Sequence, residues 1–207
     1  MDKSAIILVG GLSSRFGVDK GLVELAGKPL IKHALDAVKS VADEILIVAG
    51  SSSQSESYLK VVGSDAKIVV DEMNLKSPLV GALTGFKNAV GEYACLLPCD
   101  APFISSKILA FLYEICLGKA AVIPRWPNNN IEPLHAIYNR EMAYEASKEA
   151  LSEGKFDLRS MISKLRGVRY VSTLVLQQLD PELRTFFNVN TRLDLKRAEA
   201  VLKGLKE

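Results

Sequence analysis

The stretch that decides the fold is ILVGGLSSRFGVDKGLVEL, residues 6–24. An apolar run of strand length, residues 5–9, stops at the adjacent glycines Gly10 and Gly11. Without a Cβ in the way, the backbone N–H groups of such residues can face a cavity, and successive N–H groups in a turn bind anions. The stretch therefore predicts a buried strand followed by an anion-binding loop.

Two cationic side chains belong to the same loop. Arg15 offers a planar fork of donors and Lys20 offers a compact point charge, which together suit a polyphosphate. With Gly10 and Gly11 they predict a site for a nucleoside triphosphate. The plainer alternative is a glycine-rich turn whose charges are solvated.

The loop matches neither of the common phosphate-binding motifs. A dinucleotide fingerprint needs G-x-G-x-x-G, but the glycines stand at positions 10, 11 and 17. A P-loop needs G-x-x-x-x-G-K followed by Ser or Thr, and here Gly27-Lys28 is followed by Pro29. These mismatches disfavour an NAD-type oxidoreductase and a Walker-type NTPase.

Beyond this loop, the composition is that of a globular protein. The 207 residues suit one domain, 1–207, and 48% are hydrophobic against 24% charged. A net charge of +2 gives no electrostatic case for nucleic acid. No apolar run approaches the roughly 20 residues of a membrane span. Cys95, Cys99 and Cys116 include no C-x-x-C pair, so we expect buried thiols and a cytoplasmic protein.

Apolar runs of strand length alternate with segments of helical period along the whole chain. Such alternation predicts a mostly parallel sheet covered by helices on both faces, in a three-layer α/β/α domain. The expected strands are 5–9, 45–49, 68–70, 93–97, 120–123, 134–138 and 168–171. The expected helices are 30–41, 51–62, 77–90, 105–117, 140–153, 157–165 and 192–205.

Ligands of such sheets bind beyond the carboxyl ends of the strands. Besides the glycine pair, those ends carry Gly50, Asp71 and Asp100. Ser105 is the expected cap of the next helix, so Asp100 is better explained as an oxygen ligand of Mg²⁺. Asp71 would orient a nucleoside hydroxyl or contact the metal through water. The alternative for each aspartate is a turn-forming role.

Two later segments are candidates for an acceptor side. Glu132 and His135 could line a cleft, although a packed histidine is the favoured explanation for His135. Asn188 and Asn190 place two amides just before a helix N-terminus, where they could bind the anionic or heterocyclic groups of a second substrate. For these asparagines the alternative is a turn with a helix cap.

Four stretches in this order resemble a known family. LVGGLSSRFGVDKGLVELAGKPL, LLPCDAPFI, EPLHAIY and NVNTRLDL resemble the motifs of nucleotidyltransferases that attach a nucleotide to the molybdenum cofactor. The resemblance spans about residues 5–200 and is greatest to the guanylyltransferase (MobA-type) group. It implies a Rossmann-like, glycosyltransferase-A-type nucleotidyltransferase fold, GTP as cosubstrate, Mg²⁺ as cofactor and a molybdopterin phosphate as acceptor. It also implies hand-over to cofactor-insertion proteins or to recipient molybdoenzymes or tungstoenzymes.

Residue roles follow by position from the resemblance. On the nucleotide side, Arg15 and Lys20 would grip the triphosphate, Asp71 would contact the nucleotide and Asp100 would hold Mg²⁺. Arg15, Lys20 and Asp100 would be the catalytic residues, and Asn188 and Asn190 would face the pterin acceptor. The residues implied near the guanine and ribose are Leu8, Val9, Gly10 and Gly11, with the strand-end Gly50 beside them.

The chain departs from the family pattern at a few positions. Val9 stands where Ala is usual, Phe16 where Met is usual, and Gly50 where the guanylyltransferases often carry Asn. The run Asp19-Lys20-Gly21 favours GTP over CTP, because the related cytidylyltransferases generally lack it. The alternatives are a cytidylyltransferase, a nucleotidyltransferase for another sugar or cofactor phosphate, and a non-catalytic GTP-binding cofactor carrier.

Overall fold

The computed structural model describes residues 2–9, 16–71, 73, 75 and 77–204. The strands are β1 (Lys3–Leu8), β2 (Glu24–Leu25), β3 (Lys28–Pro29), β4 (Glu44–Ala49), β5 (Lys67–Val70), β6 (Tyr93–Pro98), β7 (Ala121–Arg125), β8 (Ala136–Asn139) and β9 (Val168–Ser172). The α-helices are α1 (Leu30–Val38), α2 (Ser52–Val62), α3 (Pro78–Asn88), α4 (Ser106–Glu114), α5 (Arg140–Ser152), α6 (Leu158–Ile162), α7 (Thr173–Leu176) and α8 (Arg192–Gly204). Short 3₁₀ turns lie at Lys20–Leu22, Gly63–Asp65 and Arg184–Phe186.

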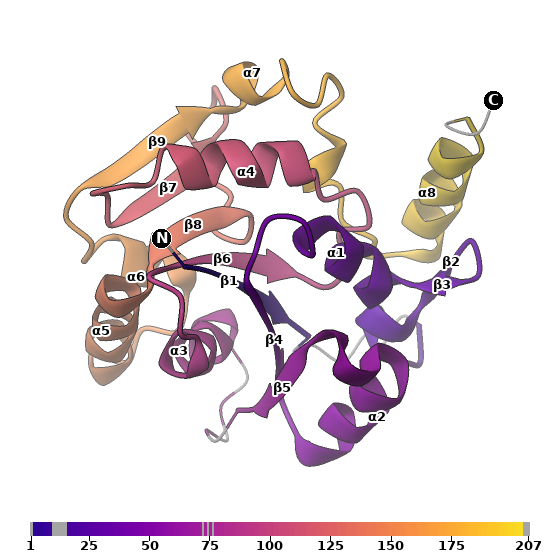
Figure 1. The fold of residues 1–207 in the computed structure, drawn as a ribbon, viewed down its shortest axis with the longest axis horizontal. Coiled ribbons are helices and arrows are strands. Elements are labelled where there is room, and N and C mark those ends of the chain that lie inside the picture. Colours follow the sequence, from indigo (N-terminus) through magenta and orange to yellow (C-terminus); the bar gives the residue numbers. More distant parts are fainter. Residues whose placement is uncertain (1, 10–15, 72, 74, 76, 205–207) are drawn as a thin grey trace.

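A mixed, mostly parallel sheet forms the centre of the molecule (Figure 1). Within the described residues its strand order is β5-β4-β1-β6-β8-β7-β9. β8 runs antiparallel to its neighbours β6 and β7, whereas the other neighbouring pairs are parallel. The carboxyl ends of β5, β4, β1 and β6 therefore meet along one edge, as the alternating sequence pattern predicts.

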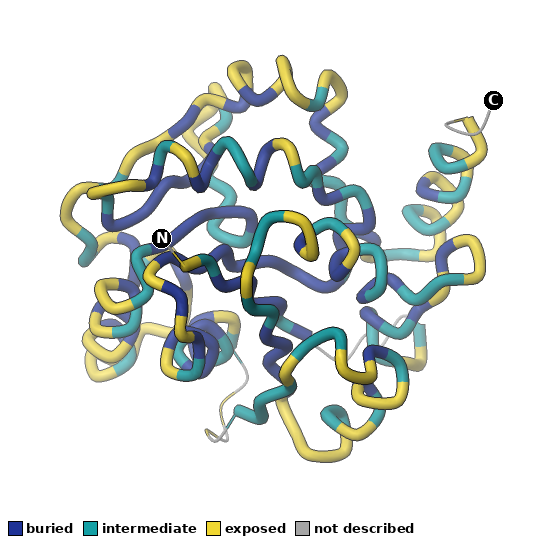
Figure 2. The backbone as a smooth tube through the Cα atoms, viewed as in Figure 1, coloured by how far each residue is buried: buried dark blue, intermediate teal, exposed yellow. Residues whose placement is uncertain are grey.

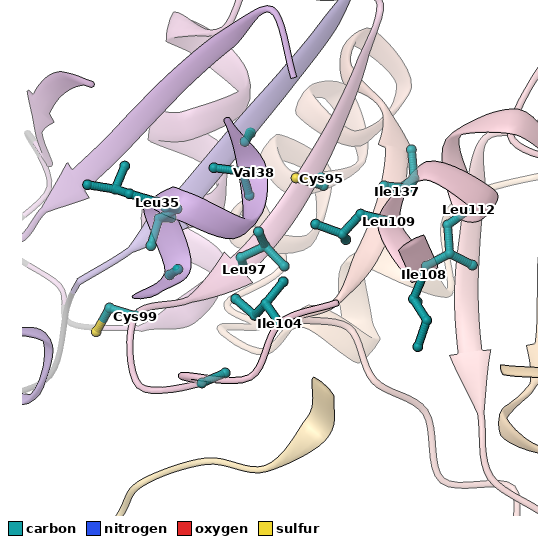
Figure 3. Packing of buried hydrophobic residues seen from close by; sticks show 14 of the residues in the cluster. Leu35, Val38, Cys95, Leu97, Cys99, Ile104, Ile108, Leu109, Leu112 and Ile137 are labelled. Carbon is teal, nitrogen blue, oxygen red and sulfur yellow. The ribbon is translucent and has the colours of Figure 1, made fainter. Parts of the chain in front are cut away.

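Helices cover both faces of this sheet, which confirms the three-layer prediction. Alternate residues of β1 point to opposite faces: Ala5 and Ile7 pack with α1, α2 and α4, whereas Ile6 packs with α3, α5 and α6. Figure 2 shows the central strands buried along most of their length. In Figure 3, leucine and isoleucine side chains of α1 and α4 meet Cys95 and Leu97 of β6.

Side-chain caps fix where the helices near the site begin. Ser77 accepts a hydrogen bond from the Val80 N–H, directly before Pro78 in the first turn of α3. Ser105 caps α4 in the same way, through the Ile108 N–H. Thr191 and Asp194 exchange hydrogen bonds between side chains and backbone N–H groups, the reciprocal pattern of a capping box. All three caps were expected from the sequence.

The fold also contains elements that the apolar pattern did not predict. β2 and β3 form a hairpin that packs with α8 and Val189 in a small separate core. The strand expected over 134–138 begins only at Ala136, so His135 precedes it. Several helices end earlier than expected; α3, for example, stops at Asn88 because Ala89 is extended. No helix in the described ranges is long and apolar enough to cross a membrane.

Candidate active site

The carboxyl ends of β1, β4, β5 and β6 open into a cavity of about 620 Å³, called the main cavity below. Five sequence-predicted site residues line it: Leu8, Lys20, Gly50, Asp71 and Asp100. They come from four strand ends and the 3₁₀ turn that begins at Lys20. The structure thus brings together groups that lie up to 92 positions apart, from Leu8 to Asp100.

Lys20 connects three elements of this cavity. Its Nζ lies 3.1 Å from Asp100 Oδ2 and donates a hydrogen bond of 2.6 Å to Asn190 Oδ1. The loop after β6 also contacts the segment before α8 through its backbone, because the Val189 N–H donates a hydrogen bond to the Asp100 carbonyl at 2.8 Å. The loop after β6, the turn at Lys20 and the segment before α8 therefore form one polar cluster.

Asp71 combines a local structural contact with a place in the cavity wall. Its Oδ1 accepts hydrogen bonds from the Met73 N–H at 3.1 Å and from Thr84 Oγ1 at 3.2 Å. The turn-forming role and a role toward a ligand are compatible, because these contacts hold the carboxylate at the end of β5 where it lines the main cavity.

A second cavity, of about 430 Å³, adjoins the first. Pro78, Pro98, Asp100 and Leu134 line both cavities, so the Asp100 loop lies at their junction. Asn188 lines the second cavity, and its Oδ1 is buried without a hydrogen-bond partner among the described residues. Two adjoining cavities that share one carboxylate are suited to two substrates that react with each other.

Comparison with known proteins identifies the family of the chain. The protein-family model named MobA-like NTP transferase domain matches residues 5–169. The chain belongs to this family. It is 33% identical over 199 residues to a probable molybdenum cofactor guanylyltransferase of Methanosarcina mazei, covering 94% of this chain and 88% of the relative. It is 33% identical over 202 residues to the molybdenum cofactor guanylyltransferase of Desulfosudis oleivorans, covering 97% and 96%.

A solved structure extends the likeness to three dimensions. The crystal structure of molybdopterin-guanine dinucleotide biosynthesis protein A from Archaeoglobus fulgidus superposes with a TM-score of 0.83. The two sequences are 28% identical, and the match covers 97% of this chain and 99% of the other. The MobA-like transferase fold expected from the four motifs is therefore confirmed.

The remaining sequence-predicted residues of this MobA-like domain lie in different places. The Val9 side chain is buried in the core, and the Val9 carbonyl accepts a hydrogen bond from Gln54, so Val9 does not line the main cavity. Asn190 lines neither cavity and contacts Lys20 instead. Gly10, Gly11 and Arg15 lie outside the described residues, and their roles stay predictions.

Gln54 on α2 is a site residue that the sequence did not indicate. Its Nε2 donates to the Val9 carbonyl at 2.8 Å and to Asp19 Oδ1 at 2.7 Å, while its Oε1 accepts from the Gly50 N–H at 2.6 Å. One amide thus joins the end of β1, the residue before Lys20 and the end of β4. The only sequence signal was its position one helical turn after Gly50 in a serine-rich segment.

Gln54→Leu is expected to lower the free energy of unfolding by about 1–3 kcal/mol, because the buried Val9 carbonyl loses its partner. We also expect weaker nucleotide binding, since the positions of Gly50 and Asp19 are no longer fixed. Chemical denaturation and a nucleotide titration measure the two effects. Ser52→Ala, at an exposed serine of the same helix that lines neither cavity, is the control and should change neither. Equal stability of wild type and Gln54→Leu would contradict the positioning role.

The described carboxylates fit one hard cation that is shared with a substrate. Asp19, Asp71 and Asp100 line the main cavity, but no group of three ligating side chains among the described residues forms a complete metal cage. The Lys20 ammonium at 3.1 Å from Asp100 shows that this carboxylate already pairs with a cation. Mg²⁺ is typically bound by one or two carboxylates together with substrate phosphates and water, and this donor set suits that mode.

Proposed function

We propose that the protein transfers GMP from GTP to the terminal phosphate of the molybdopterin cofactor and releases pyrophosphate. The observation that carries this proposal is that Asp100, which pairs with Lys20 in the Lys20–Asp100–Asn190 cluster, lines both cavities. The relatives that match nearly the whole chain are named molybdenum cofactor guanylyltransferase, and this name indicates the two substrates proposed here. GTP would occupy the main cavity, and the acceptor would occupy the second.

The proposed reaction is an in-line displacement at phosphorus. An oxygen of the acceptor phosphate attacks the α-phosphorus of GTP, and the bond to the β-phosphate oxygen breaks as pyrophosphate leaves. The acceptor phosphate is already ionised at neutral pH, so the step needs no general base. This accords with the main cavity, in which none of the described lining residues is a histidine.

The protein's contribution would be positioning and charge neutralisation. Lys20, with Arg15 as its proposed partner, would neutralise charge on the β- and γ-phosphates as it develops. Asp100 would hold Mg²⁺, which supplies electrostatic stabilisation to the phosphate oxygens when bound. Leu8, Gly50 and Asp71 would contact the nucleoside, because they line the main cavity and not the second one.

The proposed compartment is the cytoplasm, as expected from the sequence. Cys95, Cys99 and Cys116 are all buried, and burial raises the pKa of the Cys95 and Cys116 thiols to about 11. These groups therefore stay protonated and packed at neutral pH, which suits structural cysteines rather than reactive ones.

A thermal-shift comparison of GTP, CTP, ATP and UTP with Mg²⁺ tests the nucleotide assignment. We expect GTP alone to raise the melting temperature substantially, since ligand at a hundred times its Kd stabilises the folded state by about 2.7 kcal/mol. Pyrophosphate release with a panel of phosphate acceptors then tests the second substrate. A larger shift with CTP than with GTP would overturn the guanylyltransferase assignment in favour of a cytidylyltransferase.

A further inference from the structure

The second cavity is lined by apolar side chains as well as polar groups. Pro78, Pro133 and Leu134 line it, and Phe156 stands at it with 43% of its surface exposed. An exposed aromatic ring beside a cavity offers a stacking surface for a planar ligand. Because the cavity adjoins Asp100, a molecule bound there lies next to the proposed phosphate site.

A carboxylate of fixed orientation also lines this cavity. Glu132 Oε1 accepts a hydrogen bond of 2.6 Å from Trp126 Nε1, and the Glu132 N–H donates to the Pro124 carbonyl at 3.0 Å. The Trp126 ring packs edge-on against Phe186, at a centroid distance of 5.6 Å. Phe186 in turn packs against the buried ring of His135 at 5.3 Å. This aromatic row holds Trp126 in place, and Trp126 holds the carboxylate.

Glu132, Asp157 and Asn188 place hydrogen-bond acceptors in the cavity wall, and Arg159 places a donor in the same wall. The carboxylate of Glu132 has a second oxygen besides the one that Trp126 engages. The Oδ1 atom of Asn188 is buried and has no partner among the described residues. Burial raises the pKa of Glu132 above its usual value, against smaller opposing effects of Trp126 and Arg159. A half-buried acceptor of this kind is stabilised by a ligand that brings N–H donors.

We propose that Glu132 determines specificity for the acceptor's heterocycle by accepting hydrogen bonds from the amino group and ring N–H of a pterin stacked on Phe156. This inference rests on the proposed function, which supplies the pterin. A carboxylate matches two adjacent N–H donors on one edge of a planar ring, and the preorganised Trp126–Glu132 pair spares the ligand the cost of ordering that side chain. His135 also lines this cavity, and its ring packs against Phe186 in the aromatic row.

The test compares two small ligands that differ at one group. 6-Hydroxymethylpterin carries the 2-amino group, and 6-hydroxymethyllumazine has an oxygen in its place. Both lack a phosphate, so their binding is independent of catalysis and of metal. Ligand-observed NMR up to millimolar concentration should show that the wild type binds the pterin at least tenfold more tightly than the lumazine, because the lumazine oxygen faces an acceptor.

Three variants separate recognition from structure. Glu132→Gln should remove most of the preference for the pterin, because its amide offers donors to the lumazine oxygen. Trp126→Phe keeps an aromatic ring, although a smaller one, but removes the indole N–H, so it should reduce the preference by a smaller factor. Glu141→Gln, at a carboxylate of α5 with 65% of its side chain exposed, is the control and should retain the full preference.

The thermal shift with GTP and Mg²⁺ is measured on every variant and should stay at the wild-type value. A Glu132→Gln protein that is folded by this criterion and still prefers the pterin overturns the inference. Absence of pterin binding by the wild type, with the GTP shift intact, also overturns it and leaves the proposed function standing. Absence of the GTP shift in the wild type contradicts the proposed function itself.

Discussion

Asp100→Asn is expected to lower kcat for acceptor-dependent pyrophosphate release by about 100-fold or more, the usual effect of removing one preorganised electrostatic group from an active site. Asp100 lines both cavities, and only 13% of its side chain is exposed. Asparagine has nearly the same shape, but it lacks the charge that would hold Mg²⁺ and pair with Lys20. The measurement is initial-rate pyrophosphate release with saturating GTP.

A stable fold is expected to accompany this loss. The contact that joins the Asp100 loop to the segment before α8 comes from the Asp100 backbone carbonyl, which the substitution leaves in place. Asp65→Asn is a matched control, because Asp65 also pairs with a lysine, Lys32, at 3.2 Å but lies outside both cavities. Unchanged turnover in Asp100→Asn would remove this residue from the mechanism.

The sequence predicts most of the sheet because its signals are local. Continuous apolar runs mark strands covered on both faces, and helix starts carry their own caps, as Ser77 and Ser105 do. The convergence of Gly50, Asp71 and Asp100 on one cavity then follows from parallel strand order alone. Their chemical roles do not follow from that order, and they stay proposals.

The elements that the sequence did not predict depend on other kinds of information. The β2–β3 hairpin turns at Ala26 and Gly27, both with positive φ, at 53° and 76°. Such a turn is normally signalled by Asn-Gly or Asp-Gly, and alanine there gives no signal. The role of Gln54 could not be predicted from the sequence for a different reason. Its hydrogen bonds reach Asp19 and Val9, 35 and 45 positions away, so its role exists only in the folded chain.

The second cavity could be predicted only in part. The asparagines before the last helix indicated an acceptor side, and Asn188 does line this cavity. Asn190 instead contacts Lys20. The difference arises because Lys20 lies close to both the Asp100 loop and the segment before α8. Lys20 is the first residue of the 3₁₀ turn Lys20–Leu22. That turn lies just after the glycine-rich stretch and has no periodic pattern of its own.

Lys20→Met is expected to lower kcat/KM for GTP by about 100-fold or more, because the cation proposed to neutralise charge on the leaving pyrophosphate is lost. It should have a second effect in the absence of nucleotide. The Lys20 ammonium lies 3.1 Å from Asp100 Oδ2, where it competes with any metal ion for that oxygen. Removing it should raise the affinity of the protein for Mn²⁺ alone, which electron paramagnetic resonance of the free ion measures directly.

The matched control for this pair of effects is Lys32→Met. Lys32 has the same side-chain exposure as Lys20, 28%, and it too pairs with an aspartate, but away from the cavities. It should leave both turnover and Mn²⁺ affinity unchanged. The double variant Lys20→Met/Asp100→Asn should lose the gain in Mn²⁺ affinity, because the oxygen released by the first substitution is altered by the second. If Lys20→Met raises the Mn²⁺ affinity equally in the presence and in the absence of the Asp100 carboxylate, Lys20 does not compete with the metal for Asp100. The cation would then have to be held elsewhere in the cavity.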